Sequence, residues 1–330
     1  METELTVENI RVAYTDANHN AFTDLCSFRG RYYLTFRNCP DGHMLFTTSR
    51  VIVLASDDGS LWTEVFSFSV ADRDVRDPHF LVFDEKLFVY SGTWLVDPAD
   101  SRHTVMNDQL GYAVWSPDGV NWSGPKALDG THGYYIWRAA AFGGAAYLVG
   151  RRIRNFATDV SPELEREITE AILMKSPDGL SFSDAGFFAR TYGDETAFLF
   201  EPDGSILAIA RNYAVGGNAH VVRSAPPYTD WERRELPCQV GGPMLAKWGD
   251  RYLVGGRKKI GDTPPVTALW WLENDRLREI VELPSGGDTS YPGFIAIDDT
   301  RALLSYYSSH EGSGTSLAPS SIYLAELRRG

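Results

Sequence analysis

Cysteine is scarce in this chain, and long apolar runs are absent. The three cysteines (Cys26, Cys39 and Cys238) cannot all pair and show no metal-ligand spacing, so we expect buried thiols in a reducing compartment. No apolar run approaches the roughly 18 residues that span a bilayer, and no basic-then-apolar leader opens the sequence. We therefore expect a cytoplasmic protein, with a secreted or periplasmic location as the alternative if a leader has been trimmed.

Positive charge is also in deficit. The formal net charge of −13 argues against nucleic acids and anionic membrane surfaces as partners. It does not exclude a small anionic ligand, because a local group of arginines can oppose the global field. The chain lacks a Gly-x-Ser-x-Gly nucleophile motif, and its histidines lack metal-ligand spacing. We expect neither a metal nor a cofactor.

What the sequence does contain is a repeated turn. The pattern Ser-x-Asp-Gly-x-x-aromatic occurs at 56–62, 116–122 and 176–182, at intervals of 60 residues. In such a turn the aspartate accepts hydrogen bonds from nearby backbone amides, and the glycine adopts a positive φ. Repetition at this period is typical of a β-propeller.

Short strands rich in Val, Ile, Leu, Tyr and Phe fill most of the chain between Gly, Asp and Pro turns. Six segments begin alike, near Phe22, Asp77, Trp137, Glu195, Gly242 and Tyr291. We predict an all-β, six-bladed β-propeller with four-stranded blades, forming a single domain over residues 1–330. Residues 5–12 supply the outer strand of the last blade and so close the ring.

One segment breaks the strand pattern. Ser161-Pro162 is typical of a helix start, with serine as the cap and proline in the first turn. We interpret residues 152–170 as an insertion in the third blade. It is either a solvated surface excursion or a lid over the channel mouth.

Stacking the six repeats places equivalent residues around one funnel, because the first strand of each propeller blade lines the central channel. The first strands begin with Asp24, Arg76-Asp77, Trp137-Arg138, Glu195, Pro243 and Tyr291. The second strands end at Arg37, Ser91, Arg151, Arg211, Arg257 and Tyr306. Arginines at equivalent positions indicate an anion site, since a guanidinium pairs bidentately with a carboxylate or phosphate.

Several of these segments resemble the sialidases. The stretch from Glu195 to Arg211 is similar to the Glu…Asp-Gly…Arg strand pair of that family, and Gly255-Gly256-Arg257 falls where its next arginine would be. Asp288-Thr289-Ser290-Tyr291 falls where the family places its nucleophilic tyrosine. The repeated turns match the Asp-boxes, or BNR repeats, of the same family. Residues 283–293 and 305–312 resemble a bacterial, exo-α-sialidase-like subgroup.

The resemblance implies roles for particular residues. Tyr291 is the nucleophile, Glu195 its base, and Arg211 and Arg257 bind the substrate carboxylate. The family's Phe-Arg-Ile-Pro motif is missing, and Arg37 is the substitute for its arginine. No motif marks the acid/base aspartate, for which we choose Asp77. The remaining predicted substrate-binding residues are Asp24 (also the second choice for the acid/base), Trp137, Arg138, His43, Tyr306 and His310.

The expected function is a sialidase-like retaining glycoside hydrolase acting on a carboxylate-bearing sugar or glycan. A carboxylate at the anomeric carbon repels an anionic nucleophile, whereas a tyrosine is neutral until it attacks. Two alternatives stay open. Arg76-Asp77-Pro78 also resembles an element of furanosidase propellers, in which Asp24, Asp77 and Glu195 would carry catalysis. The same funnel could instead hold a glycan without cleaving it.

Overall fold

The computed structural model describes residues 5–312 and 319–330, and it confirms the six-bladed propeller. Each blade is an antiparallel sheet of four strands. The inner strands are β2 (His19–Phe28), β6 (Arg73–Phe83), β10 (Tyr135–Phe142), β14 (Gly193–Phe200), β18 (Gln239–Trp248) and β22 (Thr289–Ala296). The second strands are β3 (Arg31–Cys39), β7 (Lys86–Leu95), β11 (Ala145–Ile153), β15 (Ile206–Asn212), β19 (Arg251–Lys259) and β23 (Arg301–Ser308).

The outer half of each blade follows the same order. The third strands are β4 (Arg50–Ser56), β8 (Leu110–Ser116), β12 (Thr169–Ser176), β16 (His220–Ser224), β20 (Val266–Glu273) and β24 (Ser321–Arg328). The outermost strands are β5 (Thr63–Phe68), β9 (Ser123–Ala127), β13 (Ser183–Ala189), β17 (Glu232–Glu235), β21 (Arg276–Leu283) and β1 (Thr6–Tyr14). The inner strands thus begin two to four residues before the predicted blade starts.

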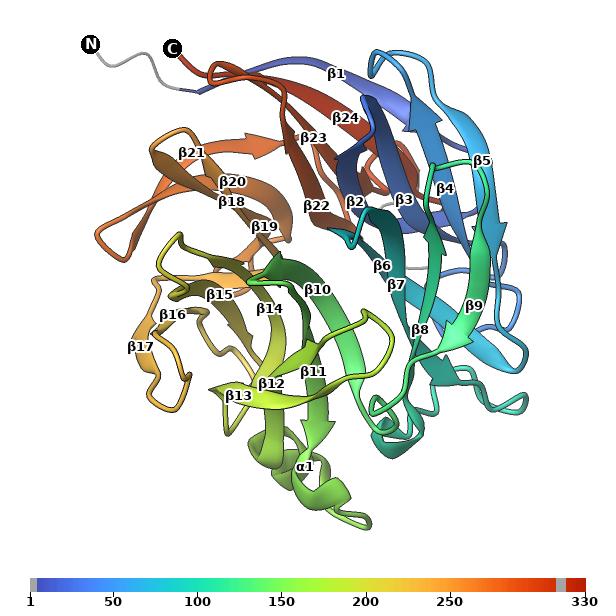
Figure 1. Ribbon diagram of the computed structural model, residues 1–330, viewed down its shortest axis with the longest axis vertical. Coiled ribbons are helices and arrows are strands. Elements are labelled where there is room, and N and C mark those ends of the chain that lie inside the picture. The colour runs from blue at the N-terminus through green and yellow to red at the C-terminus, as the bar shows by residue number, and fades with distance from the viewer. Residues whose placement is uncertain (1–4, 313–318) are drawn as a thin grey trace.

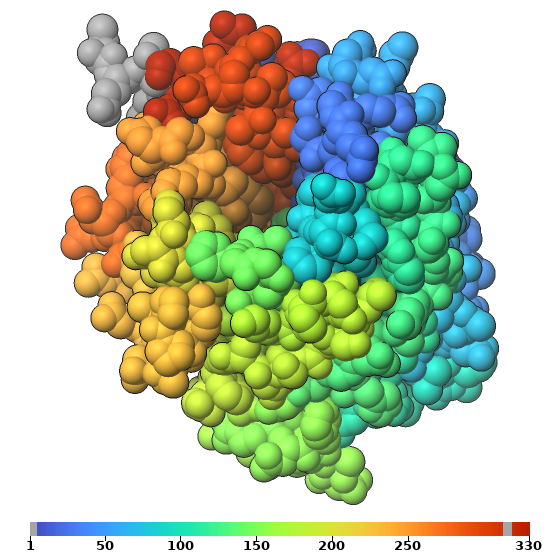
Figure 2. Space-filling view, viewed as in Figure 1, coloured from blue at the N-terminus to red at the C-terminus, as the bar shows by residue number. Residues whose placement is uncertain are grey.

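The ring closes between its first and last strands. β1 pairs antiparallel with β24 and completes the sixth blade, as Figure 1 shows. The blades follow one another around the molecule in chain order, so the colours of Figure 2 run around its face. Closure gives the sixth blade its fourth strand, and the six inner strands contact their neighbours in turn around the channel.

The core lies between neighbouring blades. Leu207 and Val221 of the fourth blade, for example, form one buried cluster with Val254 and Trp270 of the fifth. Large rings fill such spaces, and Trp248, Trp270 and Trp271 are each at most 2% exposed. This packing fixes each blade against the next, so residues at equivalent positions of different blades keep a defined geometry.

The repeated turns join the third and outermost strands of the first three blades. In each, the serine Oγ accepts a hydrogen bond from the glycine amide, at 2.9 Å for Ser56, 2.8 Å for Ser116 and 2.8 Å for Ser176. The aspartate Oδ1 accepts from the amide two residues ahead, at 2.8 Å in all three turns. The three glycines have φ between 76° and 80°. Each turn therefore has the hydrogen bonds expected from the sequence.

Within residues 5–312 and 319–330, helical structure is confined to three short pieces: the 3₁₀ turns η1 (Met106–Asp108) and η2 (Arg154–Phe156) and the helix α1 (Pro162–Ile168). η2 and α1 lie between β11 and β12, and Ser161 Oγ caps α1 by accepting a hydrogen bond from Leu164 N at 3.3 Å. In the described part of the chain, no helix is long and apolar enough to cross a membrane. All three cysteines are free thiols.

Candidate active site

A bulge at the same place in every inner strand positions the candidate residues. The pairing register between first and second strands shifts in each blade, between Ala21 and Asp24, Arg76 and His79, Trp137 and Ala139, Gly193 and Thr196, Gly241 and Met244, and Ser290 and Gly293. Four bulge residues have positive φ: Phe22 (63°), Asp77 (49°), Gly242 (55°) and Tyr291 (52°). A bulge redirects a side chain out of the alternating strand pattern. A left-handed backbone costs an ordinary residue about 1–2 kcal/mol, so strain of this kind at Asp77 and Tyr291 marks a candidate site.

These side chains meet at one mouth of the channel, in a cavity of about 300 Å³. All six blades contribute to its lining. Its charged lining residues are Arg76, Asp77, Arg151, Glu195, Arg211 and Arg257. The three predicted catalytic residues, Tyr291, Glu195 and Asp77, all line this one cavity.

Tyr291 and Glu195 form a buried pair within the cavity. The Tyr291 hydroxyl donates a short hydrogen bond to Glu195 Oε1. Glu195 Oε2 accepts hydrogen bonds from Arg211 Nη1 at 2.7 Å and from Gly242 N at 2.9 Å. Burial raises the pKa of Glu195, but the charge of Arg211 and the hydrogen bond from Tyr291 outweigh it and hold the pKa at about 2. Burial and the neighbouring Glu195 raise the pKa of Tyr291 well above its ordinary value. The proton therefore rests on the tyrosine, next to an ionised acceptor.

Asp77 is the second carboxyl group of the cavity, and its surroundings are different. Tyr135 donates a short hydrogen bond to Asp77 Oδ2, while the buried Oδ1 has no hydrogen-bond partner among the described residues. Burial, with a contribution from the negative charge of Glu195, raises the pKa of Asp77 to about 6 against the opposing charge of Arg76. A carboxyl group with a raised pKa and one free oxygen is suited to carry a proton.

Three arginines surround the tyrosine. Arg211 pairs with Glu195 and also lies 3.2 Å, through Nε, from Asp194 Oδ2. The Arg257 guanidinium lies 5.6 Å from the centre of the Tyr291 ring, and its Nη1 is 3.7 Å from Asp288 Oδ1. Arg76 lies over the Phe22 ring at 5.0 Å and donates to the His43 carbonyl at 3.1 Å. The Arg211 and Arg257 side chains remain 33% and 23% exposed, which leaves them accessible to an anion.

Arg37 does not belong to this group, contrary to the sequence-based expectation. Its side chain is 0% exposed and pairs with Asp74 through Nε at 3.2 Å and Nη2 at 2.5 Å. Its other donors bond to the carbonyl oxygens of Gly42 at 3.0 Å and Met44 at 2.9 Å. Arg37 is therefore paired with the buried carboxylate of Asp74, which belongs to the second blade. Arg76, adjacent to Asp77 in the sequence, lines the cavity instead.

Asp24 and Arg138 lie further along the channel. They line a separate cavity of about 190 Å³ that shares no lining residue with the first. Asp24 Oδ1 pairs with Arg138 Nη1 at 3.0 Å, and Arg138 also donates to the carbonyl oxygens of Pro243 at 3.2 Å and Pro292 at 2.7 Å. This pair crosslinks inner strands of four blades. It corrects the expectation that both residues contact the same ligand as Tyr291.

Trp137 packs against the Tyr291 ring and does not line the cavity. It is 2% exposed, and its ring meets the Tyr291 ring edge to face, with ring centres 6.2 Å apart. The aromatic lining comes from Phe22, Trp94, Tyr135 and Tyr291. No sequence motif marks Tyr135 and Trp94, whose rings are suited to stacking on a sugar.

The remaining predicted residues divide in two. His43 lines the cavity, whereas Tyr306 and His310 lie outside it, both packed on Tyr323 with ring centres 5.3 and 4.8 Å away. Tyr306 is buried and donates to the Pro284 carbonyl at 3.2 Å. The two faces of a strand alternate, so it is the next residue, Tyr307, that reaches Asp288 near the site, at 2.7 Å.

His19, His43 and Asp288 form a cluster whose ligating atoms lie within 4.8 Å of one another. Both histidines contact Asp288 Oδ2, His19 through Nε2 at 2.8 Å and His43 through Nδ1 at 2.5 Å. Two cations crowd the same group, since Arg37 Nη1 is 3.3 Å from His19 Nδ1 and Arg257 Nη1 is 3.7 Å from Asp288 Oδ1. This positive field opposes a metal ion, and the arrangement is better suited to fixing the position of His43.

Comparisons with known proteins agree with this architecture. No family model and no curated protein sequence matches the chain. Among solved structures, a Dyadobacter fermentans protein of unknown function superposes with a TM-score of 0.81 at 20% identity, covering 99% of both chains. Trypanosoma rangeli sialidase gives a TM-score of 0.69 at 15% identity over 94% of this chain and 55% of the sialidase. A GH32 β-fructofuranosidase of Bombyx mori gives 0.56 at 12% identity over 96% and 62%. At these identities the likeness establishes the fold, which is that of glycoside hydrolase propellers.

Proposed function

We propose that this protein is a retaining glycoside hydrolase acting on a sugar that carries a carboxylate. The observation that carries the proposal is the hydrogen bond from the Tyr291 hydroxyl to the buried Glu195 carboxylate, in the same cavity as Asp77 and the arginines. In this assignment Tyr291 is the nucleophile, Glu195 takes its proton, and Asp77 is the acid and base. The sialidase neighbours, one in complex with sialic acid, make sialic acid the first sugar to test.

Arg211, Arg257 and Arg76 bind the substrate carboxylate. A guanidinium offers paired N–H donors that match a carboxylate, and all three line the cavity beside the tyrosine. Arg76 takes the place that the sequence assigned to Arg37. An anionic substrate also explains why the nucleophile is a tyrosine, because a neutral hydroxyl does not repel the sugar's carboxylate.

Two steps complete the reaction. In the first, the Tyr291 oxygen bonds to the anomeric carbon as the bond to the leaving oxygen breaks. The tyrosine proton moves to Glu195, and the Asp77 proton moves to the leaving oxygen. In the second, Asp77 removes a proton from water, whose oxygen bonds to the anomeric carbon as the bond from that carbon to the Tyr291 oxygen breaks. Tyr291 recovers its proton from Glu195. Two displacements at one carbon retain its configuration.

Substrate binding itself prepares the base. In the empty site Arg211 holds the pKa of Glu195 at about 2, which makes the carboxylate a poor proton acceptor. A substrate carboxylate competes for Arg211 and adds a negative charge nearby. Both effects raise the proton affinity of Glu195 at the moment when Tyr291 must lose its proton.

The arrangement favours this chemistry over a furanosidase-like set of three carboxylates. Asp24 would have to act with Asp77 and Glu195, yet it lines a different cavity and is paired with Arg138 at 3.0 Å. A glycan-binding protein without catalysis is the remaining alternative, and it requires no proton on Asp77.

The test is turnover of a fluorogenic α-sialoside and of other acidic and furanoside glycosides by the wild type and Tyr291→Phe. Tyr306→Phe is the matched control, a buried tyrosine outside the cavity. We expect an acidic glycoside to be cleaved, with activity lost in Tyr291→Phe and kept in Tyr306→Phe. Turnover that persists in Tyr291→Phe would indicate that Asp77 and Glu195 carry out catalysis without the tyrosine. Binding of an acidic glycoside without turnover would leave a binding protein.

A further inference from the structure

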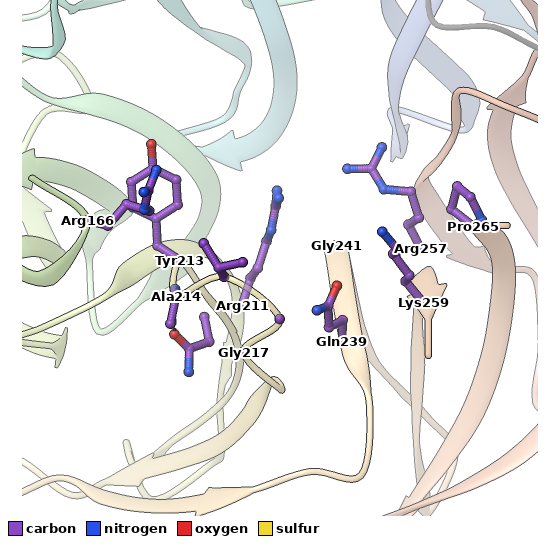
Figure 3. A pocket seen from close by; sticks show the side chains of 13 residues that line it. Arg166, Arg211, Tyr213, Ala214, Gly217, Gln239, Gly241, Arg257, Lys259 and Pro265 are labelled. Atoms are coloured by element: carbon purple, nitrogen blue, oxygen red, sulfur yellow. Dashed lines mark hydrogen bonds between the residues drawn. The ribbon is translucent and has the colours of Figure 1, made fainter. Parts of the chain in front are cut away.

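A second cavity, of about 480 Å³, adjoins the candidate active site. It shares Arg211 and Arg257 with the site and extends outward between the fourth and fifth blades (Figure 3). We call it the basic basin and define it by Arg166, Arg211, Tyr213, Gln239, Arg257 and Lys259. Figure 3 shows Arg166 and Tyr213 on one side and Arg257 and Lys259 on the other.

The charge of the basic basin is one-sided. Its lining holds four cationic side chains and no carboxylate, in a chain whose net charge is −13. Lys259 pairs with Gln239 through its backbone, but its side-chain ammonium has no hydrogen bond or ion pair with any described residue. Arg166 has only a distant contact, 3.7 Å from a Glu163 carboxylate that is itself 78% exposed. Arg211 and Arg257 contact carboxylates of the candidate active site, so Lys259 and Arg166 supply the positive charge that is freest to attract an anion into this cavity.

The preceding residue of the same strand provides the contrast. Lys258, on the other face of β19, pairs with Glu279 at 2.7 Å and Glu282 at 2.8 Å. Two carboxylates therefore neutralise Lys258, whereas the side chain of Lys259 lines the basic basin without such a partner. This difference is local, and the overall charge of the protein does not account for it.

The insertion in the third blade completes the basin. Arg166 belongs to α1, so the segment between β11 and β12 brings a cation to a cavity otherwise formed by blades four and five. Tyr213 and Gln239 add hydroxyl and amide groups that can hydrogen-bond to sugar hydroxyls. Because Arg211 and Arg257 line both cavities, a ligand whose carboxylate contacts them can continue directly into the basin.

We propose that the basic basin is a subsite for a second anionic group of the same glycan. The inference rests on the proposed function, and it specifies the substrate as an oligosaccharide bearing at least two negative charges on neighbouring units. Arg211 and Arg257 bind the first carboxylate, while Arg166 and Lys259 bind the second anion.

The experiment measures binding by titration calorimetry, which does not depend on turnover. The probes are N-acetylneuraminic acid, its α-linked dimer, galacturonic acid and digalacturonic acid, with inorganic phosphate in parallel. The variants are Lys259→Ala and Arg166→Ala, and Lys258→Ala is the matched control. We expect at least one dimer to bind the wild type about tenfold more tightly than its monomer, since charge-assisted hydrogen bonds are the strong ones. Each basin variant should weaken the dimer about threefold or more relative to the monomer, and the control should change neither.

Other results separate the two proposals. Equal affinity for dimer and monomer would overturn the proposed subsite and leave the proposed function standing. The same conclusion would follow if Lys259→Ala weakened the binding of dimer and monomer equally. Phosphate that binds more tightly than either dimer would make the basin a site for free anions. If no sugar acid binds and no acidic glycoside is cleaved, both proposals fall.

Discussion

Two carboxyl groups share the cavity, and their surroundings drive their proton affinities apart. Burial raises the pKa of Asp77 to about 6, whereas Arg211 and Tyr291 overcome burial and hold the pKa of Glu195 at about 2. Divergence of this kind within one site assigns an acid and a base. At the residue scale the proposed mechanism therefore depends on which group holds a proton near neutral pH.

The pH dependence of turnover tests whether Asp77 is the general acid. Asp77 must be protonated in the first step, so kcat/KM should fall as pH rises above about 6. Asp77→Asn should remove this basic limb and slow turnover by roughly 10²–10⁴-fold, the range for general acid–base catalysis. Steady-state kinetics from pH 3 to 9 on the glycoside cleaved best would measure both effects. If kcat/KM still fell above about pH 6 in Asp77→Asn, the titrating group would be a residue other than Asp77.

Asp77→Asn should change stability in the opposite direction from its effect on turnover. Because the folded state raises the pKa of Asp77, folded protein binds more protons than unfolded protein between about pH 4 and 6, and stability falls as pH rises through this window. Asp77→Asn should therefore be more stable than the wild type above pH 6, by up to about 2–3 kcal/mol, and lose that advantage near pH 4. Urea unfolding near pH 4 and at pH 7.5 measures this difference in the free energy of unfolding. Asp299→Asn, at an exposed position, is the control. Destabilisation by Asp77→Asn at pH 7.5 would mean that the native carboxylate is favourably paired.

Gly242 packs against Tyr291 and bonds to Glu195, so it holds this pair in position. A Cβ at this residue would lie 2.6 Å from Tyr291 Cδ2, at a backbone φ of 55°, and the Gly242 amide bonds to Glu195. Gly242→Ala should lower turnover by about 10²-fold through displacement of the ring, with a stability loss of about 1–3 kcal/mol. Gly144→Ala is the control, because it has φ of 76° and nothing within 4 Å of its Cβ. Equal activity in the two variants would show that the tyrosine position does not matter.

At the element scale, the bulged inner strands and the closing strand organise the site. The bulges of four inner strands place Phe22, Asp77, Glu195 and Tyr291 in one cavity, and the ring keeps those strands in place. β1 carries much of that closure. Besides pairing with β24, its Arg11 bonds to Glu326 of the same blade at 2.6 Å and to the Gly59 carbonyl of the first blade at 2.6 Å.

Removal of the chain through Tyr14 should open the ring. It would expose β24 as an unpaired edge, so we expect a lower melting temperature and self-association. Arg11→Ala keeps the strand and removes only a partly exposed pair, which should cost about 0.5–1 kcal/mol. Thermal unfolding and light scattering measure both outcomes. A truncated protein that stays monomeric and melts with the wild type would show that β1 is dispensable.

At the scale of the whole molecule, the repeats were sufficient to predict the architecture. Blade number and ring closure follow from strand–turn–strand segments of similar length, because each segment can bury its faces only against its neighbours. The same stacking predicted that Asp77, Glu195 and Tyr291 lie together. They are 96 to 214 residues apart in sequence, yet each lies in the bulge of its inner strand, in three different blades.

Side-chain direction was harder to predict. Arg37 ends a second strand as Arg211 and Arg257 do, but the buried Asp74 of the neighbouring blade pairs with it, and no local pattern reveals that contact. The strand pattern predicts Tyr306 at the site, but it is the next residue, Tyr307, that faces the site, because a shift of one residue reverses the face of a strand. Asp24 lies just past its bulge and therefore points along the channel instead of toward the mouth.

The most direct test of the central claim is the identity of the residue that bonds to the sugar. The wild type would be incubated with the fluorinated analogue of whichever acidic glycoside it cleaves, and the modified peptide identified by mass spectrometry. A covalent Tyr291 nucleophile predicts one sugar per chain, attached to Tyr291, and no adduct in Tyr291→Phe. An adduct on Asp77 or Glu195, or turnover with inversion of configuration, would contradict it.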